Sequence, residues 1–136
     1  MEECIFCGIV KGEILSARVI DTERSLAFLD IMPARKGHVL VIPKKHAEII
    51  TDLEPADLQD VVIIVQRVAD TMFKALKCDG VNIHQCNRSA AGQVVNHVHF
   101  HLIPRKEGDN LNFGWPHEAY GKGEIEQFAE KIKNQL

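Results

Sequence analysis

Three histidines stand at alternate positions in the stretch His97-Val98-His99-Phe100-His101-Leu102. In a β-strand, side chains two residues apart point to the same face, so all three imidazoles would lie on one face. On an α-helix the same spacing would spread them around the axis, and no common site would form. Apolar residues alternate with the histidines and Pro104 ends the run, which favours a strand. The stretch therefore predicts a strand over 97–102 with an apolar back and a face of three imidazoles.

Three aligned imidazoles allow more than one kind of chemistry. They could hold a catalytic metal ion with an open coordination position, which would make the protein a zinc-dependent phosphoester hydrolase. A neutral imidazole could instead attack phosphorus directly and form a covalent phosphoramidate intermediate. The simplest interpretation is a solvated face without a function. The spacing alone leaves these alternatives open.

A second candidate site is the pair Cys4 and Cys7. Their CxxC spacing can bring two thiolates onto one small ion, although buried cysteines without a metal are the plainer interpretation. Met1-Glu2-Glu3 carries acidic residues where a signal peptide would carry basic ones, so we expect a cytoplasmic protein. In that compartment, reduced or metal-bound thiols are expected rather than disulfides.

Length and composition restrict the kind of protein that carries these residues. The chain has 136 residues, 46% of them hydrophobic and 26% charged, which is typical of one globular domain spanning 1–136. No apolar run approaches the roughly 20 residues that cross a bilayer. A net charge of −3 argues against extended nucleic-acid binding, which usually needs a basic surface.

The remaining pattern indicates the elements that position the histidines. Strands are expected at 17–21, 25–30, 38–42 and 80–86, a long helix at about 55–77 and a short terminal helix at 124–134. The long helix should bury one apolar stripe formed by Leu58, Val62, Val65, Ala69, Met72 and Leu76. Extra apolar width at 61–65 indicates a second packing surface, such as a subunit contact. We expect an α+β fold, an antiparallel sheet of about five strands with one long helix packed on it and short terminal helices.

The histidine run resembles the signature of the histidine triad (HIT) superfamily, His-Φ-His-Φ-His-Φ-Φ with Φ apolar. Four further blocks fit the same pattern in family order: 4–7, 29–31, 37–46 and 91–93. The resemblance covers about 4–105 and leaves 106–136 as a C-terminal tail. It implies a HIT-like fold and a nucleotide hydrolase or nucleotidyl transferase that acts at the α-phosphate. Phosphoramidates, adenylates and dinucleoside polyphosphates are the implied substrates.

The resemblance also implies the roles of individual residues. His99, the middle histidine, would be the nucleophile that holds the nucleotidyl group covalently. His101 would contact the phosphate and the departing atom, and His38 would complete the catalytic cluster. The implied nucleotide-binding residues are Asp30, Ile31, Asn87, Gly92, Gln93, His99 and His101. An AMP-type purine nucleotide and a homodimer are implied as partners, and a module that binds nucleotides without turnover is the alternative.

Zinc-bearing members of the superfamily combine a CxxC pair with two histidines. The ligands implied on this chain are Cys4, Cys7, His46 and His97, which would form a closed structural zinc site. Two positions depart from the family pattern, since Cys86 replaces an asparagine and Val94 replaces a Ser or Thr of many relatives. The hydroxyl at the latter position helps to protonate the leaving group, and valine has none. His84 is expected to be structural.

Overall fold

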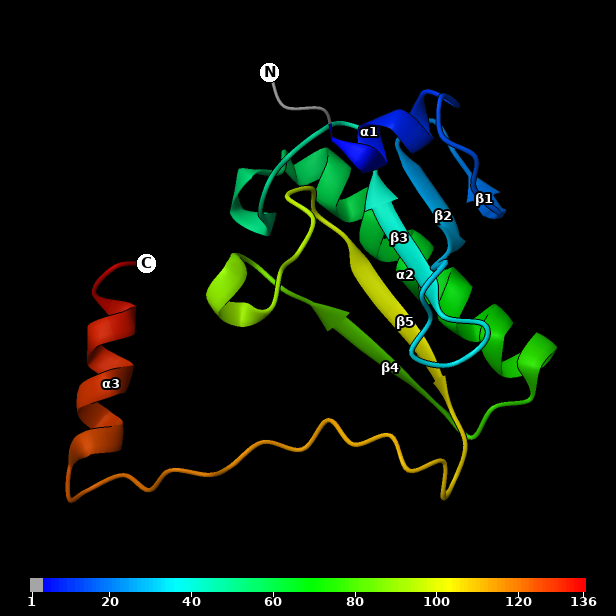
Figure 1. Ribbon diagram of the computed structural model, residues 1–136. Coiled ribbons are helices and arrows are strands. Elements are labelled where there is room, and N and C mark those ends of the chain that lie inside the picture. The colour runs from blue at the N-terminus through cyan, green and yellow to red at the C-terminus, as the bar shows by residue number, and fades with distance from the viewer. Residues whose placement is uncertain (1–3) are drawn as a thin grey trace.

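The computed structural model describes residues 4–136 (Figure 1). Residues 1–3, on which part of the cytoplasmic prediction depends, lie outside the described residues. Neighbouring strands pair antiparallel in the order β1-β2-β3-β5-β4. The elements in chain order are α1 (Ile5–Val10), β1 (Arg18–Asp21), β2 (Ser25–Leu29), β3 (Val39–Pro43), η1 (Ile50–Asp52), α2 (Pro55–Leu76), β4 (Gly80–Gln85), η2 (Ser89–Ala91), β5 (Phe100–Arg105) and α3 (Glu124–Lys133). The predicted α+β fold with a five-stranded antiparallel sheet is confirmed.

The long helix α2 packs along one face of the sheet (Figure 1). Its buried apolar side chains are Val61, Ile64, Val65, Val68 and Met72. The predicted stripe is correct in part: Val65 and Met72 are buried and Leu58 and Ala69 pack against the core. Val62 and Leu76 do not belong to it, since Val62 is 46% and Leu76 43% exposed. The run at 61–65 is apolar on every side, so periodicity alone could not tell which strip the sheet covers. Val62 and Ile63 are left on the outward side of the helix.

The opposite face of the sheet is covered at one end by α1. Phe6 and Ile9 of this helix form a second apolar cluster with side chains of β2 and β3. Farther across the same sheet, Leu40, His101 and His84 stand directly opposite one another on β3, β5 and β4. Directly opposed residues of antiparallel strands share a face. The histidine side of β5 and β4 is thus the side that carries α1.

The histidine stretch is less regular than predicted. Strand β5 begins at Phe100, so His97 and His99 precede it and only His101 lies within it. Pro43, the last residue of β3, has no backbone N–H for the ladder, and its carbonyl accepts a hydrogen bond from the His97 ring at 2.8 Å. Before β5 the stretch is therefore held by this side-chain bond and by a backbone bond from the N–H of Val98 to the carbonyl of Ala47 at 2.9 Å. The alternation itself holds, because Val98, Phe100 and Leu102 all belong to the core cluster beneath α2.

The chain leaves β5 as an arm, residues 106–123, that leads to α3. Figure 1 shows α3 standing apart from the sheet at the end of this arm. The predicted terminal helix is confirmed at Glu124–Lys133. Arg105 holds the start of the arm through two hydrogen bonds to Asp109, at 2.8 and 2.7 Å. Within residues 4–136, no helix is both long enough and apolar enough to cross a membrane.

Candidate active site and metal-binding cluster

His99 lies at the centre of the candidate site. It is only 6% exposed, and its ring contacts Phe6 edge-on at 5.2 Å and His101 at 4.9 Å between centroids. Its Nδ1 lies 2.7 Å from the carbonyl oxygen of His97. A carbonyl can only accept, so Nδ1 carries the proton and donates it. In the neutral ring, Nε2 is then the nitrogen that keeps the lone pair, which is the form a nucleophile needs.

Two further imidazoles form a hydrogen-bonded pair beside it. The backbone N–H of Ala34 donates to Nδ1 of His38 at 3.0 Å, which places the proton of His38 on Nε2. This Nε2–H donates to Nδ1 of His101 at 2.9 Å. By the same reasoning, His101 carries its proton on Nε2. The chain of bonds thus fixes the tautomers of both rings and leaves the His101 Nε2–H free to donate.

Burial keeps these two rings neutral. It lowers the pKa of His101 to about 4, with further lowering from the nearby imidazoles His99 and His38. Burial also lowers the pKa of His38, against a raising effect of the Asp30 carboxylate 3.7 Å away. At neutral pH both rings act as hydrogen-bonding groups without charge. The site can orient a phosphoryl group without placing fixed positive charge on these histidines.

Asp30 and His38 are held together at the start of β3. The backbone N–H of Asp30 donates to the carbonyl of His38 at 2.9 Å, and one carboxylate oxygen accepts the N–H of Met32 at 2.8 Å. Gly37 permits the turn before His38, since its φ is +96° and an added Cβ would lie 2.8 Å from Cδ1 of Leu76. Ile31 is 91% exposed. Of the two predicted nucleotide contacts on this loop, Ile31 is thus fully accessible, whereas the Asp30 side chain is 19% exposed and lies beside His38.

Gln93 and Asn87 use their amides inside the protein. The side chain of Gln93 accepts from the N–H of Arg88 at 2.6 Å and donates to the carbonyl of Glu48 at 2.7 Å. Asn87 accepts from the N–H of Ile50 at 2.8 Å and exchanges two hydrogen bonds with Gln85. These bonds shape the loop before the histidine stretch. A nucleotide-binding role for Asn87, Gln93 and neighbouring Gly92 stays a prediction.

A separate cluster joins the CxxC pair to two histidines. Sγ of Cys4 lies 3.4 Å and Sγ of Cys7 3.6 Å from Nδ1 of His97. Nδ1 of His46 lies 3.4 Å from Sγ of Cys7 and 3.1 Å from Nδ1 of His97. The His97 ring donates from Nε2 to Pro43, so the nitrogen that faces the sulfurs carries a lone pair.

These distances fit a tetrahedral zinc ion. With Zn–S near 2.3 Å and Zn–N near 2.0–2.1 Å, ligand atoms should lie about 3.5 Å apart for a sulfur and a nitrogen and about 3.3 Å for two nitrogens. The four donor atoms lie within 4.8 Å of one another. Burial raises the pKa of the Cys7 thiol and lowers that of His97 to about 4. Metal binding would therefore displace the proton of the Cys7 thiol, whereas the His97 imidazole is already neutral and needs to lose none.

The three histidines of the triad do not form one donor set. Within residues 4–136, groups of donors close enough to share an ion are the Cys4, Cys7, His46 and His97 cluster and a second group of Asp30, His38 and His101. His99 belongs to neither, and the hydrogen bond between His38 and His101 accounts for the second group. This arrangement argues against the alternative in which all three triad residues bind one catalytic zinc.

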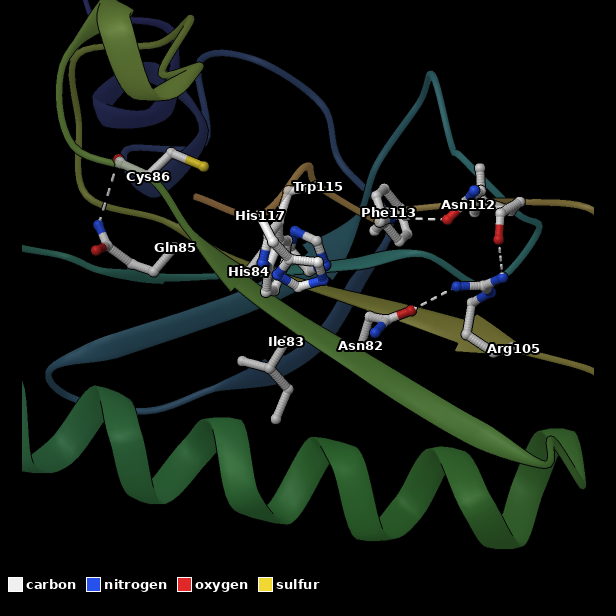
Figure 2. A pocket seen from close by; sticks show the side chains of 12 residues that line it. Asn82, Ile83, His84, Gln85, Cys86, Arg105, Asn112, Phe113, Trp115 and His117 are labelled. Atoms are coloured by element: carbon white, nitrogen blue, oxygen red, sulfur yellow. Dashed lines mark hydrogen bonds between the residues drawn. The ribbon is translucent and has the colours of Figure 1, made fainter. Parts of the chain in front are cut away.

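A cavity of about 730 Å³ opens beside β4, on the histidine side of the sheet. Figure 2 shows the side chains that line it: Asn82, Ile83, His84, Gln85, Cys86 and Arg105 from the sheet and its end, and Leu111, Asn112, Phe113, Trp115 and His117 from the arm with Gly114. This cavity could not be predicted from the sequence, because no periodic pattern indicates that the arm returns over β4. The register of β4 and β5, which places His84 opposite His101, could not be predicted from the sequence either.

Sequence and structure comparisons agree with this architecture. The HIT domain family matches residues 11–108, and the chain belongs to that family. A Candida albicans protein named adenosine 5'-monophosphoramidase is 42% identical, over 98% of this chain and 91% of its own length. The prediction of a HIT-type enzyme is thereby confirmed.

Solved structures show the same fold. A crystal structure of a HIT family protein from Bacillus subtilis superposes with a TM-score of 0.93 at 36% identity, over 99% of this chain and 98% of that one. A zinc-bound histidine triad family protein from Mycobacterium smegmatis superposes with a TM-score of 0.77 at 34% identity, over 98% of this chain and 97% of that one. Zinc thus occurs in a structural neighbour.

Proposed function

We propose that this protein hydrolyses an AMP-type purine nucleotide at the α-phosphate, through a nucleotidyl group held covalently on His99. A nucleoside phosphoramidate is the substrate we favour, because the Candida albicans relative is named adenosine 5'-monophosphoramidase. The observation that carries the proposal is the bond from Nδ1 of His99 to the His97 carbonyl. In the neutral ring this bond leaves the lone pair on Nε2, next to His101, which can donate to a phosphoryl oxygen.

The reaction would proceed in two steps. Nε2 of His99 attacks the α-phosphorus, the bond to the leaving group breaks, and a phosphoramidate bond to His99 forms. The Nε2–H of His101 donates to the phosphoryl oxygens, and the Asp30 carboxylate accepts the ribose hydroxyls. Water then attacks the same phosphorus, releases the nucleoside monophosphate and restores His99. Adenylates and dinucleoside polyphosphates offer the same phosphorus with other leaving groups.

We further propose a structural zinc ion at Cys4, Cys7, His46 and His97. The ion would tie α1 to the residues that precede β5. His97 lies two residues before the nucleophile, and its carbonyl accepts the His99 bond that fixes the tautomer. Zinc at this place would stabilise the backbone that orients His99 and take no part in bond breaking.

We also propose a cytoplasmic homodimer. The outward side of α2 exposes Val62 at 46% and Ile63 at 56%, and β4 forms one edge of the sheet. An apolar helix side next to an unpaired strand edge suits association with a second copy of the chain.

A turnover screen tests the function. Adenosine 5'-phosphoramidate, an adenylate and a dinucleoside polyphosphate are each incubated with the wild type and with His99→Asn, and release of AMP is followed. We expect the phosphoramidate to be turned over fastest and the variant to lose at least about 10⁴-fold in kcat/KM. Tight AMP binding without turnover of any substrate would instead support the nucleotide-binding module.

A further inference from the structure

His84 occupies a position next to the catalytic cluster that the proposed reaction leaves without a role. It stands directly opposite His101 on the neighbouring strand, and such pairs have Cβ atoms about 4.5–5.5 Å apart on one face. Figure 2 shows His84 on the side of β4 that faces the arm, whereas Ile83 points toward α2. The ring packs on Phe113 of the arm, with 4.5 Å between centroids. It is therefore held at the boundary between the triad and the cavity.

The proposed reaction needs a proton at this boundary. An amine can leave phosphorus only when its nitrogen gains a proton, and the hydroxyl that many relatives carry is replaced by Val94. His101 and His38 are poor sources, because burial lowers the pKa of both, that of His101 to about 4. Their hydrogen-bond chain also fixes each proton where it is.

The other groups at the cavity are less suited to proton transfer. Arg105 is held by Asp109 and donates to Asn82 at 2.7 Å, and a guanidinium does not release its proton near neutral pH. His117 and Cys86 also line the cavity, but neither stands opposite a triad residue in the sheet. His84 alone among these groups pairs with His101 across β4 and β5.

We propose that His84 is a catalytic residue that gives a proton to the leaving amine, and that the cavity beside β4 receives this amine. The proposal rests on the proposed function. In the first step, the bond between phosphorus and His99 forms, the bond between phosphorus and the amine breaks, and the proton passes from the His84 imidazolium to the amine nitrogen. In the second step, neutral His84 takes a proton from the attacking water as the bond to His99 breaks. Imidazole can serve in both directions near neutral pH.

Two substrates with different leaving groups test the role of His84. An N-alkyl phosphoramidate of AMP needs a proton on its leaving nitrogen, whereas the p-nitrophenyl ester of AMP releases a stable anion. We expect His84→Gln to lower kcat/KM for the phosphoramidate by about 10²-fold or more and for the ester by less than about threefold. Each variant thus carries its own control, because a misplaced His99 would slow both substrates alike.

His84→Phe provides a second variant that keeps a ring against Phe113 and has no proton to give. The same loss with the phosphoramidate, with the ester retained and the thermal midpoint unchanged, supports the proposal. Equal losses with both substrates, or no loss with the phosphoramidate, overturn it while the proposed function stands. A wild type that turns over neither substrate contradicts the proposed function itself, and the role of His84 is then overturned with it.

Discussion

Removing one thiol from the Cys4, Cys7, His46 and His97 cluster should weaken the stabilisation of the fold by zinc. A ligand that binds only the folded chain adds about 4.1 kcal/mol to the free energy of unfolding at a free concentration 1,000 times its Kd. Unfolding entropy is about 2.1 cal/mol/K per residue, so the 136 residues give about 0.29 kcal/mol/K. The zinc-loaded wild type should therefore melt about 14 °C above the chelated protein.

Cys7→Ser keeps the size of the side chain but weakens the ligand. Sγ of Cys7 lies 3.4 Å from His46 and 3.6 Å from His97, so it contacts both nitrogen donors. If zinc affinity falls about 100-fold, the stabilisation at the same free zinc concentration falls to about 1.4 kcal/mol. The difference between the zinc-loaded and chelated midpoints should then shrink to about 5 °C.

The assay is thermal unfolding in a zinc buffer and in a strong chelator, with bound zinc counted by elemental analysis. Cys78→Ser is the matched control, because Sγ of Cys78 only donates weakly to the carbonyl of Met72 at 3.7 Å, and it should keep the full difference. An equal difference in Cys7→Ser and Cys78→Ser would refute the assignment of the cluster. Immediate loss of activity on chelation, with the fold intact, would refute a structural role.

Three further predictions concern the titration of His101, the turn at Gly37 and the outward side of α2. Because burial lowers the folded-state pKa of His101 to about 4, the unfolded chain binds its proton first, so stability is full above about pH 6.5 and falls toward about pH 4. In urea unfolding across that range, the free energy of unfolding should fall less steeply with decreasing pH in His101→Asn than in the wild type, by up to about 1.4 kcal/mol per pH unit. Equal pH slopes of the free energy of unfolding would contradict this. Gly37→Ala places a Cβ 2.8 Å from Leu76 at a φ of +96°, and should lower the free energy of unfolding by about 1–3 kcal/mol in the same assay, whereas an unchanged midpoint would be inconsistent with the strained turn. Sedimentation should find the wild type as two chains and Ile63→Glu as one, and a wild type that stays monomeric at all concentrations would contradict the proposed dimer.

The residues of the candidate site were largely visible in the sequence. Period-two spacing placed the imidazoles on one side because alternation survives even where His97 and His99 fall outside a regular strand. The resemblance to the HIT superfamily joined Cys4 and Cys7 to His46 and His97, and the structure brings all four within 4.8 Å of one another. Both predictions depend on local spacing or on motifs with several blocks.

The features that could not be predicted from the sequence depend on contacts between segments far apart in the chain. The phase of α2 could not be read from an all-apolar run such as 61–65, since the sheet decides which strip is buried. His84 looked structural because only the pairing of β4 with β5 places it opposite His101. The cavity needs the arm to pack Phe113 on His84, and this contact between distant segments has no local signal.

The covalent nucleotidyl-histidine is the central claim, and quenched-reaction mass spectrometry tests it most directly. The wild type is mixed with adenosine 5'-phosphoramidate, quenched within the first turnover without exposure to acid, and measured intact before and after acid treatment. We expect a fraction of the protein to gain one adenylyl group that acid removes and that peptide mapping places on His99, with no gain in His99→Asn. A wild type that releases AMP with no adduct at any quench time, or His99→Asn that keeps both adduct and turnover, would contradict the account.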